Sequence, residues 1–169
     1  MIKPHGSDTL MPLYVEDETV RNQLEQEAET LPSILLNSAA ASNVVMLGAG
    51  YFTPLAGFMN VADIISVANN MQTSNGLFWP TPISNLTYDT TQIESAKRIA
   101  LRDPNVEGAP IIAIQDIDAI EELNKEQIPA ITKIIYGTTD SSHPGAATFM
   151  SLGNKVVSGP IQVLNYSYF

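Results

Sequence analysis

The sequence has no cysteine and only two histidines, His5 and His143. Disulfides are therefore excluded, and so is a closed zinc site, which needs four nitrogen or sulfur ligands. Carboxylate-only binding of Mg²⁺ stays open, because Asp and Glu are abundant. No apolar run approaches the roughly 20 residues that span a bilayer, and residues 1–12 lack the basic and then apolar pattern of a signal peptide. We expect a cytoplasmic protein.

Positive charge is also scarce: 8 Lys and Arg stand against 18 Asp and Glu, which gives a net charge of −10. Such a surface repels polyanions, so the composition argues against nucleic-acid binding. Only Lys97, Arg98 and Arg102 cluster. Arg98 and Arg102 could hold an anion, but two cations on one strand face more often form surface ion pairs with nearby carboxylates.

The order of patterns along the chain predicts an α+β fold. Residues 1–15 form an extended arm in which Leu10, Leu13 and Val15 pack onto the core. Helices are expected first, at 17–29, 37–47 and 60–71. Strands and further helices follow; the strands are expected at 77–79, 83–88, 96–102, 110–114, 156–157 and 161–168, and the helices at 124–135 and 146–152.

Two segments between the predicted helices and strands are less regular. Residues 117–123 fit a strand or a helix equally well, and 137–145 are expected to form a loop. Because the elements do not alternate as βαβ, we expect an antiparallel sheet or small barrel with the helices concentrated in the N-terminal third. The length of 169 residues fits a single domain, 1–169, which the abrupt end after a strand marks as cut at a domain boundary.

Motifs of common chemistry are weak. Gly48-x-Gly50 lacks the preceding strand and the third glycine of a dinucleotide site, and a helix end explains it better. Asp140, the serines after it and His143 contain the residue types of a hydrolase triad. Triad members normally come from distant parts of a chain, so this adjacency favours a structural loop.

Aromatic residues gather between positions 51 and 79. Packing in the core is the more common role of such residues, and the alternative is a docking surface for another domain. The segment 50–59 is too apolar to be freely solvated, so something must cover it. The aromatic set is Tyr51, Phe52, Phe58, Phe78 and Trp79.

Five segments resemble the ATP sulfurylase (sulfate adenylyltransferase) family, in order and at the family's spacing, and the first of them is Leu31-Pro32-Ser33. Gly50–Met59 resembles its Gly-Phe-x-Pro-Leu-x-Gly-Phe-Met signature, and Gly137–Gly145 resembles its Gly-Thr-Thr-Asp-x-x-His-Pro-Gly loop. Residues 96–108, with Leu101–Pro104, resemble one of its strands and the turn after it, and Val157–Leu164 resembles the last strand before its catalytic domain. The resemblance implies a PUA-like barrel with helical decoration, which is the first domain of those enzymes.

The resemblance also implies where the chemistry lies. Family members transfer the adenylyl group of ATP, with Mg²⁺ on the nucleotide, to sulfate and release pyrophosphate. They do so in a second domain that carries Gln-x-Arg-Asn, His-x-x-His and Gly-Arg-Asp-His, and this sequence contains none of these motifs. We therefore expect no catalytic, cofactor or metal site here, an inactive fragment, and a parent that is a homo-oligomer. The candidates for the contact with the catalytic domain are Tyr51, Phe52, Pro54, Leu55, Gly57, Phe58, Met59, Thr139, Asp140, His143, Pro144 and Gly145.

Two other interpretations stay open. PUA-like folds often bind RNA, so the chain could be a free-standing RNA-binding module, although its acidic charge argues against this. It could also be an inert truncation product.

Overall fold

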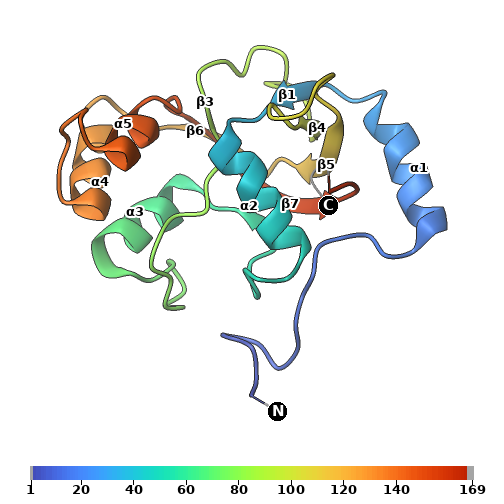
Figure 1. Ribbon diagram of the computed structural model, residues 1–169, viewed down its shortest axis with the longest axis horizontal. Helices are drawn as coiled ribbons and strands as arrows, with labels where there is room; N and C mark the ends of the chain where they lie inside the picture. Colours follow the sequence, from blue (N-terminus) through green and yellow to red (C-terminus); the bar gives the residue numbers. More distant parts are fainter. Residues whose placement is uncertain (1, 167–169) are drawn as a thin grey trace.

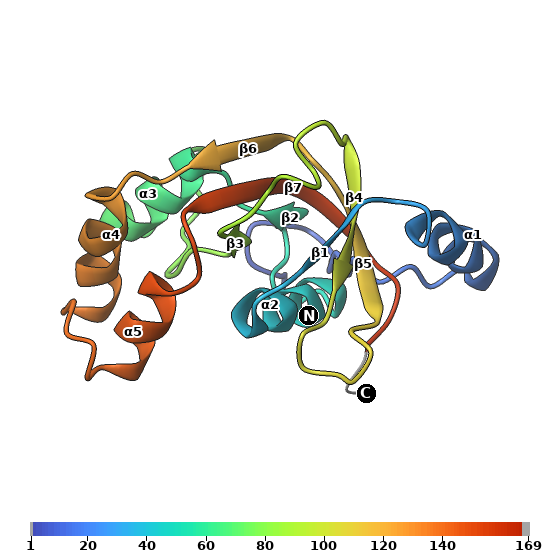
Figure 2. The same ribbon diagram turned by 90° about the horizontal axis from the view of Figure 1, so that it is seen from above.

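A single long strand, β7 (Lys155–Val163), runs through the computed structural model, which describes residues 2–166. Figures 1 and 2 show it as the curved strand on which the other strands assemble. Those strands are short: β1 (Ser33–Leu35), β2 (Gly57–Phe58), β3 (Leu86–Thr87), β4 (Arg98–Arg102), β5 (Ile111–Asp116) and β6 (Ala119–Glu122).

The sheet has the order β1-β4-β5-β7-β2, and β3 and β6 also pair with β7. All pairs are antiparallel except β1 with β4. The first half of β7 pairs with β3 and β6, and its second half pairs with β5 and β2. β7 therefore pairs with four other strands along its length. The sheet curls into a half-barrel, as expected for an α+β fold of PUA-like type.

Five helices surround the sheet within residues 2–166. Figures 1 and 2 place α1 at one end of the molecule, α4 and α5 at the opposite end, and α2 against β7. Two of the five lie in the N-terminal third, a third starts just after it, and two lie late in the chain, where the sequence also predicted them. Their bounds are α1 (Glu18–Ala28), α2 (Ser38–Gly48), α3 (Val61–Asn70), α4 (Gln127–Tyr136) and α5 (Pro144–Met150).

The three N-terminal helices begin where a polar side chain can cap them. The side chains of Asp17, Asn37 and Asn60 each accept a backbone N–H of the first turn, which satisfies a donor that the helix itself leaves unpaired. α4 ends at Gly137 in the left-handed conformation, which glycine adopts without a steric penalty.

The core lies inside the half-barrel and under α2 and α3. It is aliphatic, with Val44, Ile64, Ile99 and Leu101 essentially inaccessible to solvent. A second, smaller cluster fills the outer face of the sheet, where Ala28 of α1 meets Ala100, Ile114 and Leu164. Both faces of β4 and β5 are thus buried, one by the main core and one by α1.

Several predictions about the strands need correction. Residues 156–157 and 161 onward do not form two strands, because β7 passes without a break through Ser158-Gly159-Pro160. Gly159 adopts a φ of 137° there, and only glycine reaches such a conformation without a Cβ clash. Residue 168, at the end of the second predicted strand, lies outside the described residues.

The predicted strand at 77–79 is reduced to an isolated bridge between Gln72 and Phe78, and that at 83–88 to the two residues of β3. The ambiguous segment 117–123 contains strand β6. Leu13 and Val15 of the arm pack as predicted, but Leu10 is 66% exposed, so its predicted packing is wrong.

Among residues 2–166 no helix has the length and apolar content needed to traverse a bilayer.

Candidate functional site

The turn after α2 holds the first group of candidate contact residues. Thr53 is buried, donates a hydrogen bond to the carbonyl of Gly50 (2.7 Å) and accepts one from the N–H of Met11 (2.9 Å). The peptide bond between Thr53 and Pro54 is cis. This network ties the turn to the N-terminal arm, so its geometry is fixed from within the domain.

The same turn divides its side chains between the interior and the surface. Phe58 and Met59 are buried in the main core, and Phe52, Pro54 and Leu55 are half-buried. Tyr51 points outward and is 74% exposed. Most of the apolar segment 50–59 is thus covered by the domain itself, and the part available to a partner is centred on Tyr51.

Gly57 lies where this segment pairs with β7. A Cβ at that position would lie 2.1 Å from the carbonyl oxygen of Gly159, far inside van der Waals contact. β2 and β7 therefore approach each other closely enough that only glycine fits at position 57.

The loop between α4 and α5 and the first two residues of α5 hold the second group of candidates. The loop predicted at 137–145 ends at His143, because α5 begins at Pro144. Asp140 accepts a hydrogen bond from the N–H of Ser142 (2.8 Å), and Thr138 accepts one from the N–H of Asp140 (3.0 Å). The Ser142 N–H holds the pKa of Asp140 below its ordinary value, because it stabilises the carboxylate. Thr139 and Pro144 are exposed, and Gly145 is half-buried.

His143 has a defined structural task in this loop. Its Nδ1 accepts the N–H of Ala146 at 3.2 Å and so caps α5, and its ring packs against Tyr136. An accepting Nδ1 carries no proton, so the neutral ring has its proton on Nε2. The residues resembling a triad thus make local turn and cap bonds, as the sequence indicated. Figures 1 and 2 show this loop and the turn after α2 lying apart, so the two groups form separate surfaces.

The two arginines of β4 are already paired. Arg98 donates through Nε to Asp116 (2.6 Å) and through Nη1 to Glu27 (3.0 Å), and these bonds raise its pKa above the ordinary value, the one to Asp116 more strongly. Arg102 donates to the Ser33 hydroxyl (3.1 Å) and the Ala109 carbonyl (3.1 Å). This arrangement supports the ion-pair interpretation; anion binding remains a prediction that nothing here supports.

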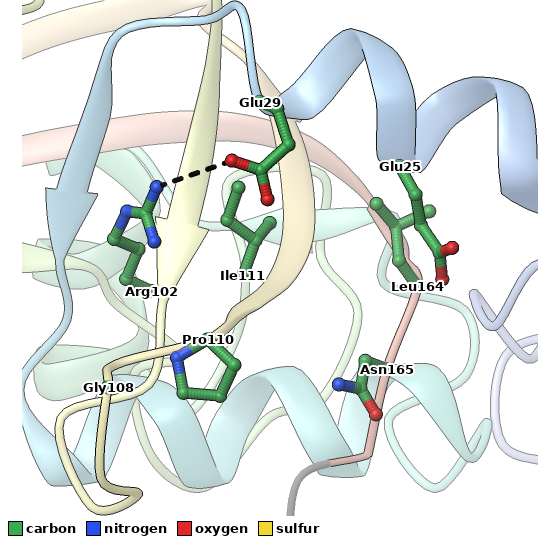
Figure 3. A pocket seen from close by; sticks show the side chains of 8 residues that line it. All are labelled: Glu25, Glu29, Arg102, Gly108, Pro110, Ile111, Leu164 and Asn165. Atoms are coloured by element: carbon green, nitrogen blue, oxygen red, sulfur yellow. Dashed lines mark ion pairs between the residues drawn. The ribbon is translucent and has the colours of Figure 1, made fainter.

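A cleft of about 460 Å³ opens beside Arg102, between α1 and the ends of β4 and β5. In Figure 3 Glu29 faces Arg102 across it, at an Nη2 to Oε2 distance of 4.0 Å, and Glu25, Leu164 and Asn165 close the other side. Two carboxylates and one committed arginine make this cleft unsuitable for ATP or sulfate. Among the described residues no group of three or more His, Asp or Glu is placed to hold a metal ion.

The structure adds one candidate that the sequence analysis missed. His5, from the N-terminal arm, packs on Phe78 and Trp79 at ring-centroid distances of 6.2 and 6.0 Å. Phe52 meets Trp79 edge to face at 5.8 Å. Of the aromatic set, Phe58 and Trp79 are buried, whereas Tyr51 and Phe78 are exposed. No local pattern links His5 to residue 78, so only the path of the arm could bring them together.

Comparison with known proteins identifies the fold. A family model described as a PUA-like domain matches residues 2–166. The chain is 58% identical to a sulfate adenylyltransferase of Alcanivorax borkumensis over 169 residues, 100% of this chain and 42% of the relative. It is 52% identical to that of Allochromatium vinosum, again over 100% of this chain, with 43% of the relative covered. The chain thus spans about two fifths of these relatives.

A solved structure described as a hexameric APS kinase from Thiobacillus denitrificans has the same fold. It superposes with a TM-score of 0.67 at 25% identity, over 100% of this chain and 28% of that chain. The match over residues 2–166, the half-barrel around β7 and the full-length similarity agree with the resemblance noted in the sequence. The chain belongs to the PUA-like domain family and matches the N-terminal region of sulfate adenylyltransferases.

Proposed function

We propose that this chain is the N-terminal supporting domain of a cytoplasmic sulfate adenylyltransferase. The longer enzyme forms adenosine 5′-phosphosulfate and pyrophosphate from ATP and sulfate, with Mg²⁺ on the nucleotide. The proposal rests above all on the relatives, which carry that name and of which this chain covers about two fifths. The domain extends over residues 1–169 in this proposal.

The fragment by itself is inactive in this proposal. ATP and sulfate together carry about six negative charges, and adenylyl transfer depends on cations and positioned donors. The chain has a net charge of −10, and Arg98 and Arg102 are engaged with Glu27, Asp116, Ser33 and Ala109. The groups that handle the nucleotide and its Mg²⁺ therefore belong to the remaining polypeptide, and this chain holds no cofactor.

The partners of the domain follow from the same division of labour. The remaining polypeptide of the enzyme is the main partner, with the exposed sides of segments 50–59 and 137–145 as contact surfaces. The solved relative is described as hexameric, which supports a homo-oligomeric parent. An RNA partner is disfavoured, because the net charge of −10 repels phosphates.

An assay of the isolated chain tests this proposal. We expect no formation of ATP from adenosine 5′-phosphosulfate and pyrophosphate with Mg²⁺ present, and no stoichiometric binding of Mg²⁺–ATP or sulfate in a calorimetric titration. An active full-length sulfate adenylyltransferase of Alcanivorax borkumensis is the control for both measurements. Turnover by residues 1–169 alone, or saturable binding of either substrate, would contradict the proposal.

A further inference from the structure

Three segments that are distant in sequence meet on one side of the molecule: the arm 2–12, the turn 50–53 and the segment 71–80. The ring Nε2 of His5 lies 2.8 Å from the carbonyl oxygen of Phe78. The N–H of Met11 donates to Thr53, and Gly50 lies close against Pro12. The arm is thus fastened to both other segments.

These segments, with Thr81 and Ile83, line an open apolar pocket of about 320 Å³. Trp79 forms a buried wall, while Tyr51 and Phe78 stand at its edge with 74% and 53% of their surface exposed. No carboxylate, lysine or arginine lines it, in contrast to the acidic chain as a whole. The lining residues are His5, Tyr51, Phe52, Thr53, Phe78, Trp79, Pro80, Thr81 and Ile83.

Exposed apolar side chains are frequent in the same three segments: Tyr51 and Phe78 line this pocket, and Ile2 and Leu10 line a second one. Of the ten large hydrophobic residues that are exposed among residues 2–166, six belong to these three segments. We call this set the arm surface; it comprises Ile2, Leu10, Met11, Tyr51, Met71 and Phe78. Such a concentration on a soluble domain marks an interaction surface, whereas isolated exposed apolar residues do not.

The path of the chain indicates what covers the arm surface. The last described residue, Tyr166, stacks on Tyr14 at 4.8 Å and lies against Gly48. Gly48 is the last residue of α2, directly before the turn 50–53, so the described chain ends beside that turn, and polypeptide that follows it would start there. The relatives are more than twice the length of this chain, so they contain such a continuation.

Charge distinguishes this occupant from a second copy of the chain. Two copies of this chain would each bring a net charge of −10 and repel each other. The catalytic part of a sulfate adenylyltransferase must instead carry the cations that bind ATP and sulfate, so it complements an acidic domain. We infer that the arm surface docks the polypeptide that follows this domain in the full-length enzyme, with one apolar side chain seated in the pocket. This inference rests on the proposed function.

The test is a full-length hybrid, in which residues 1–169 replace the matching part of the Alcanivorax borkumensis enzyme. We expect amide hydrogen exchange at 50–53 and 71–80 to be at least ten-fold slower in the hybrid than in the isolated chain. The double variant Tyr51→Ser with Phe78→Ser should lose this slowing. Tyr88→Ser with Ile134→Ser is the matched control, since these side chains are also exposed (67% and 49%) but lie elsewhere, and it should keep the slowing.

Separate measurements distinguish the two proposals. ATP formation by the hybrid reports on the proposed function, and the exchange rates report on docking. An active hybrid without slower exchange, or with slowing that survives the Tyr51 and Phe78 changes, overturns the docking inference alone. Self-association of the isolated chain in sedimentation, abolished by the same two changes and accompanied by no added slowing in the hybrid, would show that a second copy is the occupant.

Discussion

At the scale of single residues, the segment 50–59 contains a position at which two backbones approach closely. Position 57 lies where β2 meets β7, and a Cβ there would collide with the backbone of Gly159. The collision involves backbone on both sides, so no rotamer change relieves it. The glycine of this segment is therefore a packing requirement of the half-barrel.

We expect Gly57→Ala to lower the free energy of unfolding by about 3 kcal/mol, at the upper end of the range for overpacked sites. Gly76→Ala is the matched control: Gly76 has a φ of 86° and nothing within 4 Å of an added Cβ, so only backbone strain of about 1 kcal/mol applies. Urea unfolding of both variants measures the difference. Equal losses for the two variants would show that β2 can move away from β7.

The loop between α4 and α5 gives a pH-dependent prediction. The pKa of Asp140 is lowered from 3.8 in the folded protein by its bond from the Ser142 N–H. The stabilisation is therefore complete above pH 3.8 and is lost as the pH falls through the lower, folded-state value. We expect Asp140→Asn to be less stable than the unmodified chain near neutral pH, and this deficit to shrink in acid. Urea unfolding across the acidic range checks this; a deficit that stays constant contradicts it.

At the scale of elements, α1 is attached to the outside of the sheet by apolar packing with an ionic clamp beside it. Ala28 packs with Ala100 and Ile114, while Arg98 joins Glu27 of α1 to Asp116 of β5. The clamp side chains are each between 34% and 45% exposed, so solvent weakens the ion pairs considerably. We attribute most of the attachment to burial and a smaller part to the clamp.

We expect Arg98→Lys to destabilise the protein by about 1 kcal/mol, because lysine keeps the charge but loses the planar fork that reaches two carboxylates. Amide exchange in residues 18–28 should accelerate, and 0.5 M salt should reduce the difference. In a Glu27→Gln background the same change should have a smaller effect, since one of its partners is already gone. A full effect in that background would show that Glu27 takes no part in the clamp.

At the scale of the whole molecule, the dominant property is the net charge of −10 on 169 residues. Like charges on a compact surface repel each other and destabilise the folded state, and salt screens this repulsion within a Debye length of roughly 10 Å at 0.1 M. The described ion pairs involve four of the eight cations, Lys3, Arg98, Arg102 and Lys155. We therefore expect the repulsion among the unpaired carboxylates to destabilise the fold by more than the ion pairs stabilise it.

We expect the melting temperature of the isolated chain to rise by several degrees between low ionic strength and about 0.5 M NaCl, because that concentration shortens the Debye length to a few ångströms. An uncharged osmolyte at the same osmolality separates screening from general solute exclusion. A melting temperature that falls with NaCl would mean that the ion pairs dominate over the net charge.

The sequence alone determined the positions of the helices and of strands β4 and β5, but not which strands pair. The capping residues Asp17, Asn37 and Asn60 and the helical spacing of apolar residues are local signals, and the helices begin where those signals predict. Strand β4 was also predictable from the sequence, because Ile99 and Leu101 alternate with Arg98 and Arg102. The family resemblance rested on ordered motifs that occupy both loops and strands.

Only the tertiary structure decided how β7 continues and what the arm does. Gly159-Pro160 is a local signal for a break, but pairing with β2, β5 and β6 outweighs it, so β7 runs on as one strand. Likewise, no periodicity places His5 beside Phe78. Contacts between residues far apart in the chain depend on the closure of the whole fold, and a local pattern carries no information about them.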